Sequence, residues 1–310
     1  MPTGLRCGQL DRRTSCHGVA AAGSGVQRNH VDTYVPMRPP ESVRTMYRLL
    51  FQAWGRQHWW PAESPFEVIV GAILTQNTAW TNVEKALARL REAGALSLAG
   101  IRQRSEEGLG ELIRSSGYFR QKAARLKAFV AFVDGEFHGS LEQMFALPTS
   151  QLRQRLLALR GVGPETADSI LLYAGNHPVF VVDAYTRRIL DRHGVLPYGS
   201  DYEEIRALCE AALGHPDFVA EAAALLAVRG HESARAAAGT PGSRHEPSTV
   251  STAARCATAQ VFNEMHGLLV GVAKTHCLKS QAHCEMCPLA SLLSRSQKAK
   301  LGKEGLLKTS

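Results

Sequence analysis

One acidic residue stands where a helix is expected to begin. Asp183 follows the apolar run 179–182 and precedes a helical pattern that starts at Ala184. Backbone N–H groups and the dipole of such a helix favour the charged form of a carboxylate, so we expect Asp183 to be ionised. An ionised carboxylate can stabilise the positive charge that develops on a sugar ring when the bond at C1′ breaks. A purely structural helix cap is the alternative that this position also allows.

A glycine-rich turn precedes this carboxylate in the chain. Gly161, Val162 and Gly163 separate a helix that ends near Leu159 from a second helix that Pro164 opens. Glycine allows positive φ angles and a close backbone approach, and proline suits the first position of a helix. The N–H groups of such a turn form an anion site that suits a DNA phosphate. A plain connection between two helices, with glycines that serve packing alone, is the alternative.

Three cysteines near the end of the chain have the spacing of a metal or cluster site. Cys277, Cys284 and Cys287 follow the pattern C-x6-C-x2-C. The whole chain has seven cysteines, an odd number, and no apolar secretory signal follows its start. This argues against a secreted disulfide framework and favours the cytoplasm, where cysteines are free or hold a metal.

Helices are the elements that must position these groups. The run 179–182 is the one strand-like stretch, and it is too short and isolated to found a sheet, so the sequence predicts an all-α fold. Apolar residues recur at helical spacing in the ranges 41–54, 66–74, 80–90, 106–116, 119–134, 149–159 and 164–174.

Composition sets the wider limits. The 310 residues are 45% hydrophobic and 21% charged, as in a globular protein with a real core. The net charge of +8 permits a polyanionic partner, and no uncharged apolar run reaches the roughly 18 residues of a membrane helix. We expect a disordered tail over 1–40 (with Met37 or Met46 as alternative starts), a partly flexible insertion over 217–258, and a basic tail over 294–310.

The turn and the carboxylate together resemble the helix-hairpin-helix/Gly-Pro-Asp superfamily of base-excision DNA glycosylases, which includes endonuclease III. The resemblance covers most of residues 45–293 and implies two helical lobes with DNA in the cleft between them. A six-helix lobe would span 64–180, and a second lobe with a C-terminal cysteine loop would combine 41–63 and 181–293. The implied partner is duplex DNA with a damaged base, and we expect a monomer without a membrane partner. The residues that carry the resemblance are Gly161, Val162, Gly163, Thr166, Ala167, Val181, Val182 and Asp183.

One departure from the family pattern bears on the reaction. Bifunctional members have a lysine two residues after the second glycine of the turn, where this chain has Glu165. A carboxylate cannot form the Schiff base that strand cleavage requires. We therefore expect a monofunctional glycosylase in which water attacks and Asp183 acts as general base or electrostatic stabiliser. A bifunctional glycosylase/lyase of the endonuclease III type and a non-enzymatic DNA-binding protein on the same fold are the alternatives.

A set of tryptophans resembles the 3-methyladenine glycosylase branch of the family. By that resemblance, Trp59 and Trp80 would sandwich the flipped base, with Trp60 and Pro61 beside them and Lys274 lining the same pocket. An electron-rich indole attracts the positive charge of an alkylated purine, and such a base has a labile glycosidic bond. Tryptophans that belong to the core are the alternative.

Other residues are expected to contact DNA. Gln76 matches the family position whose side chain fills the gap left by the flipped nucleotide. Leu159 belongs to the hairpin, and Tyr118 and Lys122 begin a helix that would touch the phosphate backbone.

The cysteine loop lacks one residue of the family pattern. Members that hold a [4Fe–4S] cluster have a fourth cysteine five residues further on, where this chain has Leu293. Three cysteines with an outside ligand, a labile cluster, a remnant without a cluster, and a Cys3His zinc site all remain open. Candidates for the outside ligand are Cys256, Cys209, His276 and His283.

Overall fold

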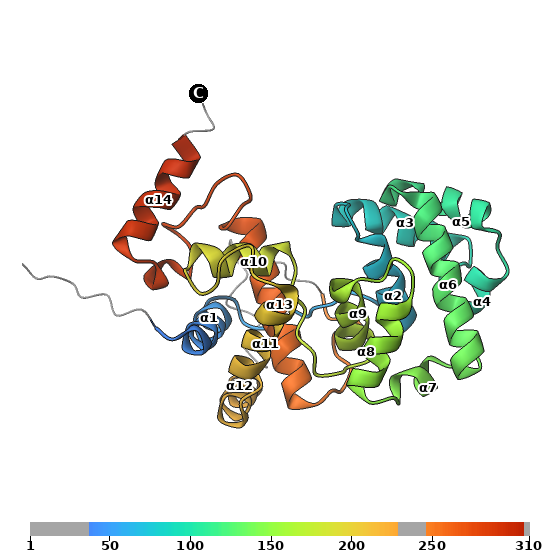
Figure 1. Ribbon diagram of the computed structural model, residues 1–310, viewed down its shortest axis with the longest axis horizontal. Coiled ribbons are helices and arrows are strands. Elements are labelled where there is room, and N and C mark those ends of the chain that lie inside the picture. Colours follow the sequence, from blue (N-terminus) through green and yellow to red (C-terminus); the bar gives the residue numbers. More distant parts are fainter. Residues whose placement is uncertain (1–36, 229–245, 307–310) are drawn as a thin grey trace, which may run out of the picture. The chain divides into compact units, whose positions relative to one another are not determined.

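The computed structural model describes residues 37–228 and 246–306 (Figure 1). These residues form helices joined by short turns, and the prediction of an all-α fold is confirmed. Within the described ranges the one β-type pairing is an isolated bridge between Cys277 and Ala282. Of the tail expected over 1–40, residues 1–36 lie outside the described residues, as do the middle of the expected insertion (229–245) and the last residues (307–310). The expectation is wrong for Pro39 and Pro40, which begin the first helix.

The helices differ in length from single turns to five turns. In chain order they are α1 (Pro39–Trp54), α2 (Pro65–Leu74), α3 (Trp80–Glu92), α4 (Leu98–Arg102), α5 (Glu106–Leu112), the 3-10 turn η1 (Arg114–Ser116), α6 (Phe119–Phe137), α7 (Leu141–Phe145), α8 (Thr149–Ala158), α9 (Pro164–Ser169), the π-helical turn η2 (Ile170–Ala174), α10 (Ala184–Arg192), α11 (Tyr202–Leu213), α12 (Pro216–Val228), α13 (Ala257–Thr275), the 3-10 turn η4 (Ala290–Leu292) and α14 (Arg295–Leu306).

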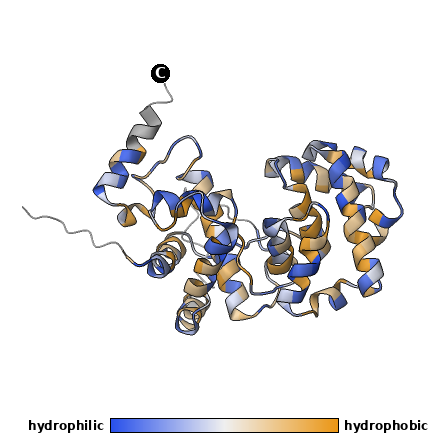
Figure 2. Ribbon diagram, in the orientation of Figure 1, coloured by the Kyte–Doolittle hydropathy of each residue, from blue (hydrophilic) through white to orange (hydrophobic). Residues whose placement is uncertain are grey.

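Helix α2 shows how the local sequence sets an element. Ser64 caps it by accepting a hydrogen bond from the Glu67 N–H at 3.2 Å, and Pro65 occupies its first turn. The Glu67 carboxylate reaches back and accepts from the Glu63 N–H at 3.1 Å. Every residue of α2 after Pro65 is buried, and the helix is hydrophobic along its length (Figure 2). It packs against α3, α6, α9 and η2, at the centre of one set of helices.

Helix α13 has the corresponding place among the other helices. It contacts α1, α10, α11 and α12, and it also meets η2, which brings the second set of helices to it. Its residues from Val261 to Ala273 are buried. A long apolar helix with neighbours on several sides is the scaffold on which polar side chains can be held in fixed positions.

The strand-like run 179–182 is buried but forms no strand in the described structure. Two side chains of α11 accept hydrogen bonds from backbone N–H groups of the run instead. The Phe180 N–H donates to the Glu210 carboxylate at 2.9 Å, and the Val182 N–H donates to the Tyr202 hydroxyl at 3.3 Å. The Val179 N–H donates to the His177 carbonyl at 2.9 Å, so three N–H groups of the buried run find partners without a neighbouring strand.

Both ends of the range predicted as an insertion pack against the rest of the protein. Helix α12 buries Phe218, whose ring meets Tyr47 edge-on at 5.4 Å between centroids. After the undescribed residues, Val250 is buried and its N–H donates to the Ala62 carbonyl at 3.1 Å. Ser248 contacts the same loop, where its hydroxyl donates to the Trp60 carbonyl at 3.3 Å. The returning segment therefore braces the loop that carries the tryptophans.

No helix in the described ranges has both the length and the apolar character needed to span a bilayer.

Candidate active site

Asp183 is the N-cap residue of α10. Its Oδ1 accepts hydrogen bonds from the Thr186 N–H at 2.7 Å and the Thr186 hydroxyl at 2.9 Å, and its Oδ2 lies 3.4 Å from His266 Nε2. Burial alone would raise the pKa of Asp183, but His266 and the Thr186 hydrogen bonds outweigh burial and hold that pKa below its usual value. The carboxylate is therefore ionised at neutral pH. Its side chain is 14% exposed, so it is still accessible.

His266 connects this carboxylate to a buried tyrosine. The ring of His266 stacks on that of Tyr173 at 5.7 Å between centroids, and the Tyr173 hydroxyl hydrogen-bonds to His266 Nδ1. Burial, followed by the negative charge of Asp183, raises the pKa of Tyr173 well above its usual value, so the phenol keeps its proton and donates it to Nδ1. With the phenol as donor to Nδ1, a ring proton of His266 lies on Nε2, facing Asp183.

The sequence analysis did not find His266 or Tyr173. Both lie in apolar helical runs, where a histidine or a tyrosine is ordinarily a core residue. The available signal was a polar ring in the middle of α13, on a face that is otherwise buried. Its partner on η2 is 93 residues away in the chain, so no local pattern connects them.

Glu165 brings a second carboxyl group to the site. It is the second residue of α9, and it lies close enough to Asp183 and His266 to interact with both. Although the residue is exposed at the surface, protein atoms crowd its carboxyl group, and this burial together with the charge of Asp183 raises the pKa of Glu165 to about 7. Two carboxyl groups with opposite pKa shifts therefore share one site.

The tryptophans form a cluster beside these groups. Trp60 meets Trp59 at 5.4 Å and Trp80 at 5.1 Å between ring centroids, both edge-on. Trp59 also meets His266 edge-on at 5.9 Å, so the cluster extends to the residue that faces Asp183. Trp59 and Trp60 are nearly buried, at 8% and 6% exposed, whereas Trp80 and Pro61 are partly exposed. In the described state the rings pack against one another, as core residues do.

Two glycines make room for this cluster. A Cβ at Gly71 would lie 3.2 Å from the Trp60 ring and 3.7 Å from the Trp80 ring. A Cβ at Gly267, the neighbour of His266 on α13, would lie 3.0 Å from the Trp59 Cβ. Their missing side chains let α2 and α13 approach the tryptophan loop closely.

The predicted hairpin forms between α8 and α9. Gly161 has φ +85°, a conformation that favours glycine, and the Val162 N–H closes the turn onto the Leu159 carbonyl at 3.0 Å. The expectation of a positive φ is wrong for Gly163, whose φ of −91° suits any residue. A Cβ at Gly163 would meet no atom of the described structure within 4 Å. The fold therefore does not require glycine there, and its bare backbone leaves space for another chain to approach.

A buried ion pair braces the two helices of the hairpin. Arg153 of α8 forms a bidentate pair with Asp168 of α9, at 2.7 and 3.1 Å, and the Tyr202 hydroxyl donates to the same carboxylate at 2.9 Å. Asp168 is fully buried, and its burial raises the pKa despite the opposing effect of Arg153. Arg153 also contacts Glu203 of α11 at 2.6 Å. This structural role of Asp168 was not expected from the sequence.

Gln76 lies against the hairpin turn. Its Nε2 donates to the Gly161 carbonyl at 3.0 Å and to the Thr166 hydroxyl at 2.9 Å, and its Oε1 accepts from Arg125. The residue expected to fill the gap in DNA is thus held next to the turn expected to bind a phosphate. Its gap-filling role stays a prediction.

Lys122 requires a correction, because it is fully buried and cannot contact a DNA phosphate. Its Nζ donates to the Leu74 carbonyl at 2.9 Å and the Ser116 carbonyl at 2.6 Å. Burial, followed by the charge of Arg125, lowers the pKa of Lys122 to about 8. Its amine closes the ends of α2 and η1. Tyr118 has the opposite character: its side chain is 64% exposed, at the start of α6.

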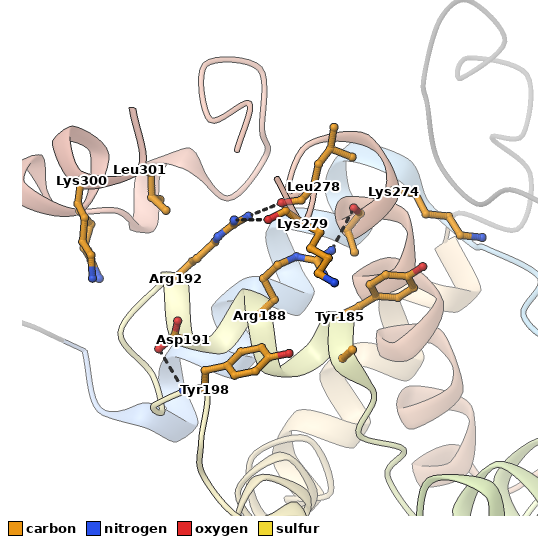
Figure 3. A pocket seen from close by; sticks show the side chains of 13 residues that line it. Tyr185, Arg188, Asp191, Arg192, Tyr198, Lys274, Leu278, Lys279, Lys300 and Leu301 are labelled. Atoms are coloured by element: carbon orange, nitrogen blue, oxygen red, sulfur yellow. Dashed lines mark hydrogen bonds between the residues drawn. The ribbon is translucent and has the colours of Figure 1, made fainter. Parts of the chain in front are cut away.

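A basic cavity of about 870 Å³ opens beside the start of α10, next to Asp183 in the chain. Arg188 reaches across to the Cys277 carbonyl at 2.8 Å. Arg192 reaches the Leu278 carbonyl at 2.8 Å (Figure 3). Asp191 is the acidic residue among those that line it. Its positively charged lining residues are Arg188, Arg192, Lys274, Lys279 and Lys300.

Lys274 also lines this cavity. Burial lowers the pKa of Lys274, although the negative charges of Glu84 and Asp183 oppose the shift. Its side chain extends away from Arg188 and Arg192 (Figure 3). Its amine is therefore close enough to the candidate site to interact electrostatically with Asp183.

The three cysteines line a small second cavity together with Leu293. In the described ranges, no three His, Cys, Asp or Glu side chains converge as the ligands of one metal ion do. Arg192 Nη1 donates to Cys277 Sγ at 3.2 Å. Two of the outside ligands expected from the sequence are excluded. Cys256 precedes the 19-residue helix α13, which is about 28 Å long at 1.5 Å per residue, whereas Cys277 follows the far end of that helix, so the two cysteines are far apart. Cys209 is buried in α11 and does not line this cavity.

Comparison with known proteins places this geometry in a family. Residues 70–214 match the HhH-GPD superfamily base excision DNA repair proteins. The chain is 46% identical to the Methanocaldococcus jannaschii protein named "Putative DNA repair glycosylase MJ1434" over 175 residues. The aligned part is 56% of this chain and 79% of that relative. It is 30% identical over 156 residues to endonuclease III of Thermotoga maritima, covering 49% of this chain and 66% of that protein. The chain belongs to the HhH-GPD superfamily of base excision DNA repair proteins.

Solved structures agree on the fold. An H. pylori 3-methyladenine DNA glycosylase bound to 1,N6-ethenoadenine superposes with a TM-score of 0.58 at 27% identity, over 77% of this chain and 98% of that one. A non-covalent complex of endonuclease III with DNA gives 0.60 at 19% identity, over 86% of this chain and all of that one, a likeness that concerns the fold alone.

Proposed function

We propose that the protein is a monofunctional DNA glycosylase that flips a damaged base, an alkylated purine, out of duplex DNA and hydrolyses its N-glycosidic bond. The observation that carries the proposal is the ionised carboxylate of Asp183, held between Thr186 and His266 beside an aromatic cluster. The family, the likeness to a relative with a repair glycosylase's name and the likeness to a 3-methyladenine glycosylase support it.

Asp183 acts in this proposal as an electrostatic stabiliser. Departure of the base leaves positive charge on the deoxyribose, and a fixed anion nearby lowers the energy of that transition state. A carboxylate whose pKa lies below its usual value is a weak base, so the low pKa of Asp183 favours stabilisation of the cation over removal of a proton from water. His266 and Thr186 act as positioning residues, because they hold the carboxylate and keep it charged.

The tryptophans provide the proposed base pocket. A flipped purine that stacks between Trp59 and Trp80 would replace contacts that these rings now make with Trp60. Indole faces attract a cationic base. The anionic carboxylate of Asp183, at the same site, also favours a base that carries positive charge. Together these features favour an alkylated purine, whose positive charge also makes it a good leaving group.

Duplex DNA would be held by the hairpin and by the basic cavity. The N-terminus of α9 has no side-chain cap, and the space above Gly163 admits a phosphate. The cavity beside α10 adds Lys279 and Lys300, whose side-chain amines form no hydrogen bond or ion pair in the described ranges. Gln76 would enter the duplex from its position beside the hairpin.

A bifunctional lyase is the competing proposal, and one amine favours it. Lys274 has a lowered pKa and interacts with Asp183, so it has the properties that a Schiff-base lysine needs. Glu165 occupies the position of the family's lysine and cannot serve, and Lys122 is buried against two carbonyls.

The proposal is tested by product analysis on methylated duplex DNA. We expect release of free methylated purine, an intact abasic strand, and no covalent adduct after borohydride treatment. Strand cleavage with a trapped adduct that disappears in Lys274→Ala would establish the lyase alternative. DNA binding without release of any base, on alkylated and deaminated duplexes alike, would support the non-enzymatic alternative.

A further inference from the structure

One arginine beside the hairpin turn has no acidic partner in the described ranges. Arg125 belongs to α6, and its side chain lies on the backbone of the turn, because a Cβ at Gly161 would come within 2.9 Å of the Arg125 Cδ and Cζ. The positive φ of Gly161 and the arginine that covers it therefore both require glycine there. The guanidinium donates to the Gln76 side-chain oxygen, a neutral acceptor.

The surroundings of this guanidinium are positively charged. Lys122 lies one turn earlier on α6, and the charge of Arg125 adds to the effect of burial in lowering the pKa of Lys122. The turn itself, residues 160–163, contributes a further cation, Arg160, and no acid. Cations that gather without a carboxylate among them favour an anion from outside the protein. A guanidinium can bind one phosphate through two parallel hydrogen bonds, each stronger than a bond to a neutral amide.

Gln76 is held at the same turn by three contacts. Its Nε2 donates to the Gly161 carbonyl at 3.0 Å and to the Thr166 hydroxyl at 2.9 Å, and its Oε1 accepts from Arg125. Both ends of the amide are thus engaged, so Gln76 cannot reach into a duplex while all three contacts are made. The Arg125 contact alone involves a charged group, and it is the contact for which an anionic phosphate competes.

We propose that Arg125 binds a DNA phosphate at the hairpin turn and that this phosphate displaces the Gln76 amide. A phosphate oxygen replaces Gln76 Oε1 as the acceptor of the Arg125 N–H, and Gln76 loses one of the three contacts that hold it. Arrival of the DNA backbone at the turn thereby frees the side chain that is expected to fill the gap in the duplex. The inference rests on the proposed function for its partner, duplex DNA, and for the role of Gln76, but not on base release.

A brace between α6 and the hairpin is the structural alternative. In that case Arg125 serves the fold through Gln76, and DNA leaves the contact intact. Loss of Arg125 would then lower the free energy of unfolding without changing how DNA affinity depends on salt. Loss of Gln76 would weaken such a brace, whereas it would free an arginine that competes for phosphate.

The test measures the affinity of the full chain for undamaged duplex DNA over a range of salt concentrations. Arg125→Met should make the plot of log affinity against log salt shallower by about 0.9, because one phosphate contact is lost. Arg125→Lys keeps the charge and should keep the wild-type slope. Arg102→Met, the matched control, removes a cation that pairs with Asp134 and should also leave the slope unchanged.

Gln76→Ala tests the exchange itself. Undamaged duplex has no gap to fill, so this variant should bind about two- to tenfold more tightly than wild type, because Arg125 no longer gives up a hydrogen bond to reach the phosphate. The salt slope should stay at the wild-type value. The gain should vanish when Gln76→Ala is combined with Arg125→Met.

An unchanged salt slope in Arg125→Met, or a wild-type chain that binds no DNA, would overturn the phosphate contact. Equal or weaker binding by Gln76→Ala, or a gain that persists without Arg125, would overturn the exchange. If Arg125→Met fails to fold by circular dichroism, the affinity of Gln76→Ala decides. None of these readouts depends on base release, so failure of the proposed glycosylase reaction leaves the test intact.

Discussion

Asp183 Oδ2 lies 3.4 Å from His266 Nε2, and the far side of the same imidazole hydrogen-bonds to the buried Tyr173 hydroxyl. The histidine is held through Nδ1, and its Nε2 faces the carboxylate. This contact joins the N-terminus of α10 to the middle of α13 and keeps the anion charged and in place. The following predictions concern this contact, the hairpin and the basic cavity.

Replacing His266 should move the acid limb of activity. His266 opposes burial and lowers the pKa of Asp183, so His266→Gln should raise that pKa. Base release needs the ionised carboxylate and falls as pH drops through its pKa. The acid limb of kcat should therefore shift to higher pH, and the variant should lose more activity than wild type as pH falls. DNA affinity should stay within about twofold. An unchanged pH profile would show that His266 does not act through Asp183.

Removing Arg153 should destabilise the hairpin. Arg153→Met leaves the fully buried Asp168 carboxylate without its partner, which costs about 3–5 kcal/mol of unfolding free energy. Arg155→Met is the matched control on the same helix, since its pair with Glu136 is exposed and should contribute about 1 kcal/mol or less. Urea denaturation measures both. Equal losses in the two variants would mean that the buried pair is not a brace.

Glu264 should make stability depend on pH. Its carboxyl group is buried and accepts from the Gln57 N–H at 2.6 Å, and burial raises its pKa to about 7. The folded state then holds a proton that the unfolded chain releases near pH 4.5, so this group's contribution to stability is lost as pH rises to about 7. The difference amounts to on the order of 3 kcal/mol.

Glu264→Gln should remove this part of the slope. The amide oxygen keeps the Gln57 hydrogen bond but carries no charge, so the variant should gain stability relative to wild type between pH 5 and pH 8. Denaturant titrations at several pH values measure the gain. A constant difference across that range would show that Glu264 does not titrate there.

The basic cavity should contribute to DNA binding through charge alone. Lys279→Ala combined with Lys300→Ala removes two of its cations, so the plot of log affinity against log salt should become shallower by about 1.8. Base release at saturating DNA should remain at the wild-type rate, because neither lysine touches Asp183. An unchanged salt slope would place the DNA backbone elsewhere.

The sequence predicted those parts of the site whose structure depends only on neighbouring residues in the chain. Asp183 caps a helix because an acidic side chain before a helical pattern does so in isolation, and Gly161 turns the hairpin because its φ is positive. The same reasoning fails where distant segments meet. Lys122 has the pattern of a basic surface helix, yet two carbonyls from other elements enclose its amine. His266 acquires its role from Tyr173 and Asp183, partners that only the fold brings near.

Base release by Asp183→Asn is the most direct measurement of the central claim. Asparagine keeps the size of the side chain and an oxygen for the Thr186 hydrogen bonds, but it has no charge with which to stabilise the deoxyribose cation. We expect binding of methylated duplex within about twofold of wild type, and single-turnover release of methylated purine slower by at least about a hundredfold (roughly 2.7 kcal/mol). Release at the wild-type rate would contradict the account.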